Sequence, residues 1–113
     1  MLKSNDKQII KNVRTAKTPF ERMKGLMFEE SGKFNYALVL EMPREARIES
    51  SIHMMFVFFP IDVLFLNKEK EVVDKATVQP FLPNYTPKKA AKYVVELPVG
   101  KAKSVRLGSK ISW

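Results

Sequence analysis

The sequence predicts a mainly β protein, α+β by content, folded as a jelly-roll-like sandwich or as a distorted, partly closed β-barrel with one helix in the N-terminal half. Six or more short apolar segments recur with turn residues between them, which is typical of such folds. Only one segment has the period of a helix, and strands do not alternate with helices as a parallel sheet would require. The 113 residues suit one domain, which we expect to span 1–113.

The N-terminal part predicts one strand and the single helix. Alternating apolar side chains over residues 8–14 favour a short, partly exposed strand. Thr18, Pro19 and Glu21 then mark a helix start, in which Thr18 caps, Pro19 occupies the first turn and Glu21 completes a capping box. We expect a helix of about three turns with one apolar face. That face carries Phe20, Met23, Leu26 and Met27.

Residues 37–42 predict a compact strand that ends at Pro43, followed by a polar, exposed connection over 44–51. A polar turn at 67–70 joins strands at 61–66 and 71–78 into a hairpin. Further strands are expected at 92–97 and between Gly108 and Trp113, after a long loop over 79–89 that contains three prolines. Eight phenylalanines in the chain indicate a bulky core.

The most apolar segment runs from Ile52 to Leu66 and is interrupted by only one His, one Pro and one Asp. Pro60 cannot donate a ladder hydrogen bond, so it divides the segment into an arm ending near Phe59 and the strand 61–66. Both faces of each part are apolar, which predicts a segment covered on both sides. The segment is shorter than the ~20 apolar residues of a membrane span, and no membrane partner is expected.

Composition limits location and chemistry. The chain has no cysteine, which excludes disulfides and thiolate sites, and its first residues lack the apolar stretch of a signal peptide. We therefore expect a cytoplasmic protein. Its net charge is +8, and residues 75–113 carry 8 basic groups against Glu96 alone, a net +7. A region with this excess of positive charge attracts nucleic acid or acidic partners, and the charge also favours solubility.

Several short motifs occur in a fixed order. They are Arg22-x-x-Gly25-Leu26-Met27, the strand from Leu38 to Pro43, His53-Met54, Phe59-Pro60-Ile61-Asp62-Val63, Val72-Val73 and Tyr93-Val94-Val95-Glu96-Leu97-Pro98-x-Gly100. In this ordered combination, from about Thr15 to Ile111, the chain resembles the family catalogued as domain of unknown function 192, or uncharacterised protein family 0127.

The resemblance implies a small, mostly β fold of jelly-roll-like or distorted-barrel type and no established activity. Many bacterial members resemble exported proteins with an N-terminal signal or lipid anchor. Their central motif is commonly Trp-Met-Lys-Asn-Thr, whereas this chain has His53-Met54-Met55-Phe56-Val57. Apolar residues replace the polar Lys, Asn and Thr, so the resemblance implies no ligand contact at these positions.

Ionisable residues in apolar or structured surroundings are the first candidates for a site. His53, Asp62 and Glu96 would supply acid-base chemistry if they met in one cleft. We favour structural roles: Arg22 suits an ion pair with Asp62 or Glu96, and Asp62 would accept backbone N–H groups at a turn. The ligand-binding candidates are Arg22, Glu41, His53, Phe81 and Tyr85. The candidates for structural motif positions are Gly25, Met27, Met54, Pro60, Asp62, Glu96, Gly100 and Gly108.

Methionines 23, 27, 54 and 55 would suit a pliable apolar pocket, although core packing is the favoured interpretation. One His with scattered carboxylates lacks zinc-type spacing, so no metal site is expected. Neither a GxGxxG nor a P-loop pattern occurs, and we expect no cofactor.

The favoured function is a non-catalytic module that binds a small molecule or a protein in a cleft between the 79–89 loop and the Arg22 helix. One alternative is RNA or single-stranded DNA binding by the basic C-terminal third, with Tyr85 and Tyr93 as stacking groups. Another is an enzyme using His53 with Asp62 or Glu96. Catalysis ranks below binding because the motifs are rich in structural residues and poor in catalytic geometry.

Overall fold

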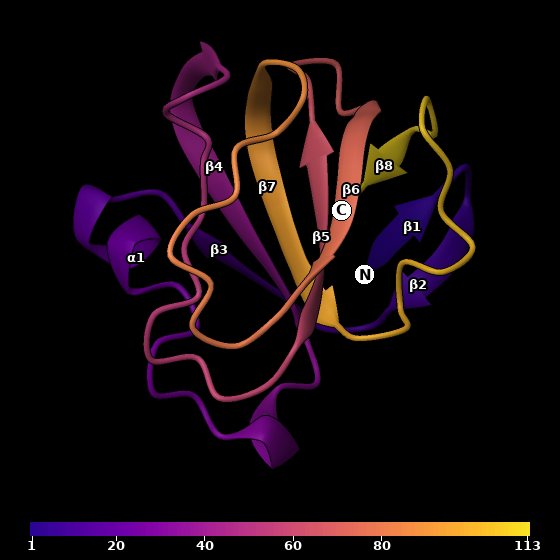
Figure 1. The fold of residues 1–113 in the computed structure, drawn as a ribbon. Coiled ribbons are helices and arrows are strands. Elements are labelled where there is room, and N and C mark those ends of the chain that lie inside the picture. The colour runs from indigo at the N-terminus through magenta and orange to yellow at the C-terminus, as the bar shows by residue number, and fades with distance from the viewer.

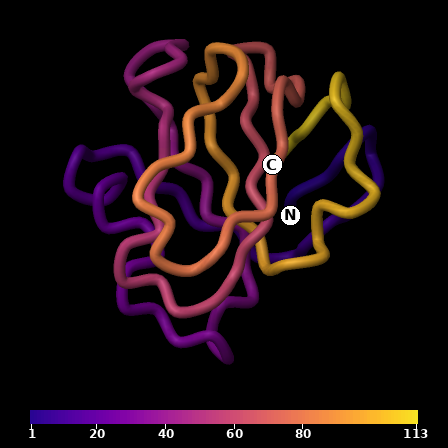
Figure 2. Tube along the Cα trace, viewed as in Figure 1, coloured from indigo at the N-terminus to yellow at the C-terminus, as the bar shows by residue number.

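The computed structural model describes residues 1–113 as two β-sheets, a short α-helix and one 3₁₀ turn (Figures 1 and 2). The helices are α1 (Pro19–Lys24) and η1 (Ser31–Lys33). The strands are β1 (Leu2–Ser4), β2 (Lys7–Ile10), β3 (Val13–Ala16), β4 (Ala37–Ala46), β5 (Ile61–Leu66), β6 (Val72–Val78), β7 (Ala91–Pro98) and β8 (Ile111–Ser112). Neither helix has the length and hydrophobicity needed to cross a membrane.

The larger sheet has five strands in the order β3-β4-β7-β5-β6, and the smaller has the order β2-β1-β8. In Figure 1 the smaller sheet lies beside β6 of the larger one, and the two chain termini are near each other. The mainly β sandwich expected from the sequence is confirmed, with the larger sheet open at β3 and β6. β3 and β4 are parallel and joined through α1, a pairing that the sequence pattern did not predict, while all other neighbours are antiparallel.

Both faces of the five-stranded sheet are covered. The sheet-side core contains 12 buried residues and brings Val39, Leu64 and Val95 of the larger sheet together with Leu2 and Ile111 of the smaller one. On the other face, the loop-side core contains 17 buried residues and draws heavily on irregular segments. It contains Ala16, Leu26, Phe34, Tyr36, Leu38, Leu40, Met42, Ile52, Met54, Val57, Phe59, Ile61, Val63, Phe65, Val78, Ala91 and Val94.

Strand β5 has the bounds expected from the sequence, and all six of its residues are buried. Val63 and Phe65 point into the loop-side core, whereas Leu64 and Leu66 point into the sheet-side core. The preceding arm is not a strand, because residues 52–59 form loops with one isolated bridge, Ile52 to Tyr85. The central block is therefore covered on both sides only after Pro60.

The helix start was predicted correctly, but the helix length was not. Thr18 Oγ1 accepts the Glu21 N–H at 3.1 Å and Glu21 Oε1 accepts the Thr18 N–H at 3.1 Å, which completes the capping box. The helix ends after Lys24 because Gly25 adopts φ +47°, a conformation that other residues avoid. No residue of α1 is buried, and of the four residues expected on its apolar face only Leu26, which follows the helix, packs into the loop-side core.

Two strand boundaries also differ from the expectation. The predicted strand 8–14 is divided between β2 and β3, which belong to different sheets. Pro43 does not end β4, which continues to Ala46. The β4–β7 register is irregular between Glu41 and Ala46, and a proline is tolerated where the ladder is already interrupted.

Only three of the eight phenylalanines are buried, so the expected bulky phenylalanine core is wrong. Four of the exposed ones form a surface cluster, in which Phe56 stacks on Phe28 at 5.1 Å and Phe81 meets Phe56 and Phe58 edge-on. Phe28, Phe56 and Phe81 have φ near +60°, which is uncommon for bulky residues. Their loops therefore hold the rings against one another at the surface.

Asp62 ties the chain after β7 to the sheet. Its carboxylate accepts the N–H groups of Gly100 at 2.9 Å and Ala102 at 3.1 Å, and the Thr77 hydroxyl at 2.8 Å. The side chain is buried, with 5% exposure. Asp62 thus holds a turn, as expected, although the turn is the one after β7 and not the bend at Pro60.

Replacing Asp62 by Ala should lower the free energy of unfolding by about 3 kcal/mol, because two backbone N–H groups lose their acceptor. Asp62→Asn should cost about 1 kcal/mol or less, since its amide oxygen can still face both N–H groups. Urea unfolding measures both. Equal losses for the two variants would show that charge, and not this hydrogen-bond geometry, is the stabilising factor.

Candidate functional site

A small cavity lies between the end of α1, strand β4 and the segment 49–57. Its volume is about 190 Å³. Leu40 and Met42 of β4 and Glu96 of β7 contribute the sheet side of the lining. The rest of the lining comes from residues 22–26 and from residues between Glu49 and Val57. We call this the α1 cavity.

The Glu96 carboxyl is the most unusual group in the α1 cavity. It extends from β7 between Leu38 of β4 and Val63 of β5, and its residue is only 4% exposed. Its Oε1 atom has no hydrogen-bond partner. Burial raises the pKa of this carboxyl to about 8, because an apolar environment disfavours the charged form. At pH 7 Glu96 is therefore mostly protonated and can both donate and accept a hydrogen bond.

Gly25 brings the chain close to this carboxyl. A Cβ atom added at Gly25 would lie 3.8 Å from Glu96 Oε1, and the residue has φ +47°. A side chain there would be strained by the backbone conformation alone. Glycine therefore lets the chain that follows α1 line the cavity directly beside the carboxyl.

His53 lines the cavity but has both ring nitrogens engaged. Its Nε2 lies 3.0 Å from the Met23 carbonyl oxygen, and its Nδ1 accepts the Met55 N–H at 3.2 Å. In this arrangement Nε2 donates to the Met23 carbonyl oxygen and Nδ1 is the acceptor. His53 thus fastens the segment 53–55 to α1, and a proton acceptor for catalysis is not free on its ring.

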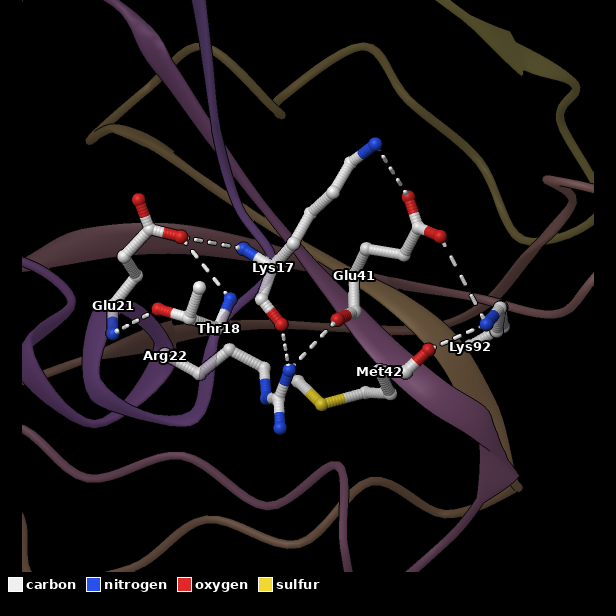
Figure 3. Close-up of polar contacts among 7 residues, drawn as sticks. All are labelled: Lys17, Thr18, Glu21, Arg22, Glu41, Met42 and Lys92. Atoms are coloured by element: carbon white, nitrogen blue, oxygen red, sulfur yellow. Dashed lines mark hydrogen bonds and ion pairs between the residues drawn. The ribbon is translucent and has the colours of Figure 1, made fainter.

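Arg22 also lines the cavity, but it does not form the expected ion pair. Its guanidinium donates to the main-chain carbonyl oxygens of Lys17 and Glu41 (Figure 3). No salt bridge joins it to Asp62 or Glu96. The guanidinium therefore links α1 to β4 through backbone groups, and Glu96 has no cationic partner.

Glu41 lies outside the cavity lining. Its carboxylate reaches Lys17 at 3.9 Å and Lys92 at 4.0 Å, and Figure 3 shows it between these two lysines. With its side chain 36% exposed, such pairs contribute at most about 1 kcal/mol. Glu41 is better explained as part of a surface charge network than as a ligand contact.

Asp62 and Glu96 lie on opposite faces of the sheet. In the β5–β7 register, Val63 pairs with Glu96 and Asp62 pairs with Leu97. Val63 belongs to the loop-side core and Leu97 to the sheet-side core, and side chains alternate between faces along a strand. The structure therefore brings His53 and Glu96 to one cavity and keeps Asp62 away from both.

The 79–89 loop does not line the α1 cavity. Phe81 belongs to the exposed phenylalanine cluster. The Tyr85 hydroxyl donates to Asp74 at 2.9 Å, and its ring stacks on Phe65 at 5.5 Å. The loop instead contacts Met54, which lines the cavity. The Met54 N–H donates to the Leu82 carbonyl oxygen, and the Phe81 N–H donates to the Met54 carbonyl oxygen.

Sequence reasoning missed several lining residues. Met42, Val57 and Leu40 gave only the signal of ordinary core positions. Lys24, at the end of α1, gave no signal of a site, and neither did Glu49 and Ser51 in the polar connection 44–51. Of the four methionines considered for a pocket, Met23 and Met54 line the cavity. Among the expected motif positions, Gly25, Met54 and Glu96 also line it.

Known proteins resemble this chain in sequence and in fold. The UPF0127 protein of Pyrococcus furiosus is 43% identical over 109 residues, which cover 95% of this chain and 90% of that protein. The UPF0127 protein of Thermococcus sibiricus is 43% identical over 103 residues, which cover 89% of this chain and 65% of the relative. The chain thus spans slightly less than two thirds of that longer relative.

A solved structure has the same fold. It is a protein of unknown function from Novosphingobium aromaticivorans with a TM-score of 0.80 and 21% identity. The match covers 89% of this chain and 74% of that one. The family model DUF192, described as "Uncharacterized ACR", matches residues 1–113. The resemblance seen in the ordered motifs is confirmed, and the chain belongs to the DUF192 (UPF0127) family.

Proposed function

We propose that the protein is a non-catalytic binding module, and that its ligand is a small, largely apolar molecule held in the α1 cavity. The observation that carries this proposal is the unpartnered Glu96 Oε1 in the cavity lining. A buried polar atom without a partner costs free energy, and such groups call for an explanation in terms of function or of an unseen partner. A ligand with one polar group would satisfy it.

The size and chemistry of the cavity restrict the ligand. A volume of about 190 Å³ is somewhat larger than the roughly 150 Å³ cavity that holds benzene in an engineered protein. A ring or branched chain with one carbonyl or carboxyl group would therefore fit. Protonated Glu96 would donate to that group, while Leu40, Met42 and Met54 would contact the apolar part.

Catalysis has less support. A general base needs a free acceptor within reach of the substrate proton, and both nitrogens of His53 already have partners. Asp62 is held by three hydrogen bonds on the other face of the sheet. Glu96 would then have to act without either of the residues expected to work with it.

Nucleic-acid binding by the expected tyrosines also has less support. Stacking on bases needs an accessible aromatic face. Tyr85 stacks on Phe65, while Tyr93 packs edge-on against Trp113 at 5.2 Å. Both rings are half-buried and already have aromatic partners.

The proposal predicts that small carbonyl-containing fragments bind the wild-type protein saturably. In amide-detected NMR, shift changes should cluster at Gly25, Leu40 and Met54. Met42→Trp should abolish them by filling the cavity, at an overpacking cost of roughly 1–3 kcal/mol. The exposed change Glu69→Gln is the matched control. Shifts elsewhere, or shifts that survive Met42→Trp, would contradict binding in this cavity.

Glu96 should also make stability depend on pH. Its pKa is about 8 in the folded state and 4.5 as the ordinary value, so the folded protein holds more protons between these values. The stabilisation linked to this proton is complete below pH 4.5 and is lost as pH rises through 8. The slope approaches roughly 1 kcal/mol per pH unit.

Glu96→Gln should remove this slope and make the variant more stable than the wild type at alkaline pH. Denaturant unfolding across this pH range measures the effect, with Glu69→Gln as the control for loss of an exposed carboxyl. Identical pH profiles for the wild type and Glu96→Gln would show that Glu96 titrates normally.

A further inference from the structure

A second, larger hollow lies on the side of the smaller sheet, away from the α1 cavity. It has a volume of about 450 Å³. One wall comes from the β1–β2 hairpin, and the other comes from the segment between β7 and β8. Figure 1 shows these two segments facing each other, in indigo and yellow. We call this hollow the hairpin basin.

The lining of the hairpin basin is polar and carries one sign of charge. Only one of its ten lining residues, Ile9, is hydrophobic, and none is acidic. Three cationic residues line it: Lys7, Lys101 and Arg106. Asp6 is next to Lys7 in sequence but does not belong to the lining.

The three cations are also without partners in the protein. The salt bridges of the structure involve Lys17, Lys33, Arg44 and Lys92, and none involves a basin residue. By contrast, the nearby Lys75 and Lys110 donate to main-chain carbonyl oxygens. Like charges that share a hollow repel one another, and an anion placed among them would relieve that repulsion.

The remaining lining residues indicate what else the ligand carries. Ser4, Ser104 and Gln8 offer hydroxyl and amide groups that both donate and accept hydrogen bonds. No aromatic residue lines the basin, so it has no surface on which a base could stack. The volume falls within the range of small-molecule sites, roughly 300–1,000 Å³.

We propose that the hairpin basin is a second binding site, and that it takes a small phosphorylated polyol of the sugar-phosphate class. The phosphate lies among Lys7, Lys101 and Arg106, where Arg106 presents the planar fork that matches phosphate oxygens. The ligand hydroxyls bond to the serine and glutamine side chains. This site is independent of Glu96 and of the α1 cavity.

Isothermal titration calorimetry with ribose 5-phosphate tests this proposal. At low salt it should bind saturably, inorganic phosphate should bind several-fold more weakly and ribose should give no signal. Affinity should fall as salt is added, because the contacts are charged and solvent-accessible. No saturable binding of ribose 5-phosphate or phosphate would overturn the site. Equal affinity for both would overturn the recognition of the polyol.

Matched charge changes locate the site. Lys101→Gln and Arg106→Gln should each weaken binding about tenfold or more, as expected when a charge-assisted hydrogen bond is lost. Lys89→Gln removes the same charge from the basic C-terminal third outside the basin and should change affinity less than about twofold. Equal losses in all three variants would show unspecific attraction. A single-stranded oligonucleotide that binds without competition from ribose 5-phosphate would favour nucleic acid and contradict the proposal.

Discussion

The burial of the Glu96 carboxyl in apolar surroundings is the constraint on which the α1 cavity depends. An isolated charge there would be costly, and burial alone raises its pKa to about 8. The protein thus keeps a neutral acid between two strands of its central sheet. Gly25 gives the chain room beside it, while Arg22 and His53 hold the neighbouring segments through backbone groups and leave Glu96 unpaired. If Arg22 had formed the expected ion pair with Glu96, the carboxylate would already have a partner and could not donate a hydrogen bond to a ligand.

The elements that were predicted well are those whose local signals agree with their surroundings. The capping box fixes the start of α1 within four residues of sequence, and the apolar run from Ile61 to Leu66 is buried on both faces as its pattern indicates. The hairpin of β5 and β6 follows from the polar turn between two apolar runs. In each case no distant contact was needed for the prediction.

The elements that were predicted wrongly depend on backbone conformations and strand pairings that the pattern of residue types does not show. Phe20 and Met23 have helical spacing, but Gly25 ends the helix early and α1 buries none of its side chains. Pro43 remains inside β4 because the register with β7 is irregular there. The parallel pairing of β3 with β4 depends on a crossover connection, and the short sequence of the four-residue strand Val13–Ala16 does not predict it. The surface phenylalanines depend on backbone conformations with positive φ that residue type alone does not predict.

Several residues of the candidate site could be predicted from the sequence, but which of them lie close together in the fold could not. Glu96, His53 and Arg22 stood out by their surroundings in the sequence, and they line one cavity. The alternation of side chains along each strand does not predict that Asp62 faces away from Glu96. Their placement on opposite faces follows from the register between β5 and β7. Phe81 and Tyr85 stood out by their loop, yet their rings meet other aromatic residues and not the cavity.

The proposed function requires Glu96 to be a neutral, buried acid that is available to a ligand. The most direct test is an NMR titration of the Glu96 side-chain carboxyl carbon in the ligand-free protein. We expect a midpoint near pH 8. A midpoint near the ordinary value of 4.5 would mean that the carboxyl is solvated or paired, and it would contradict the proposed role of Glu96 in the α1 cavity.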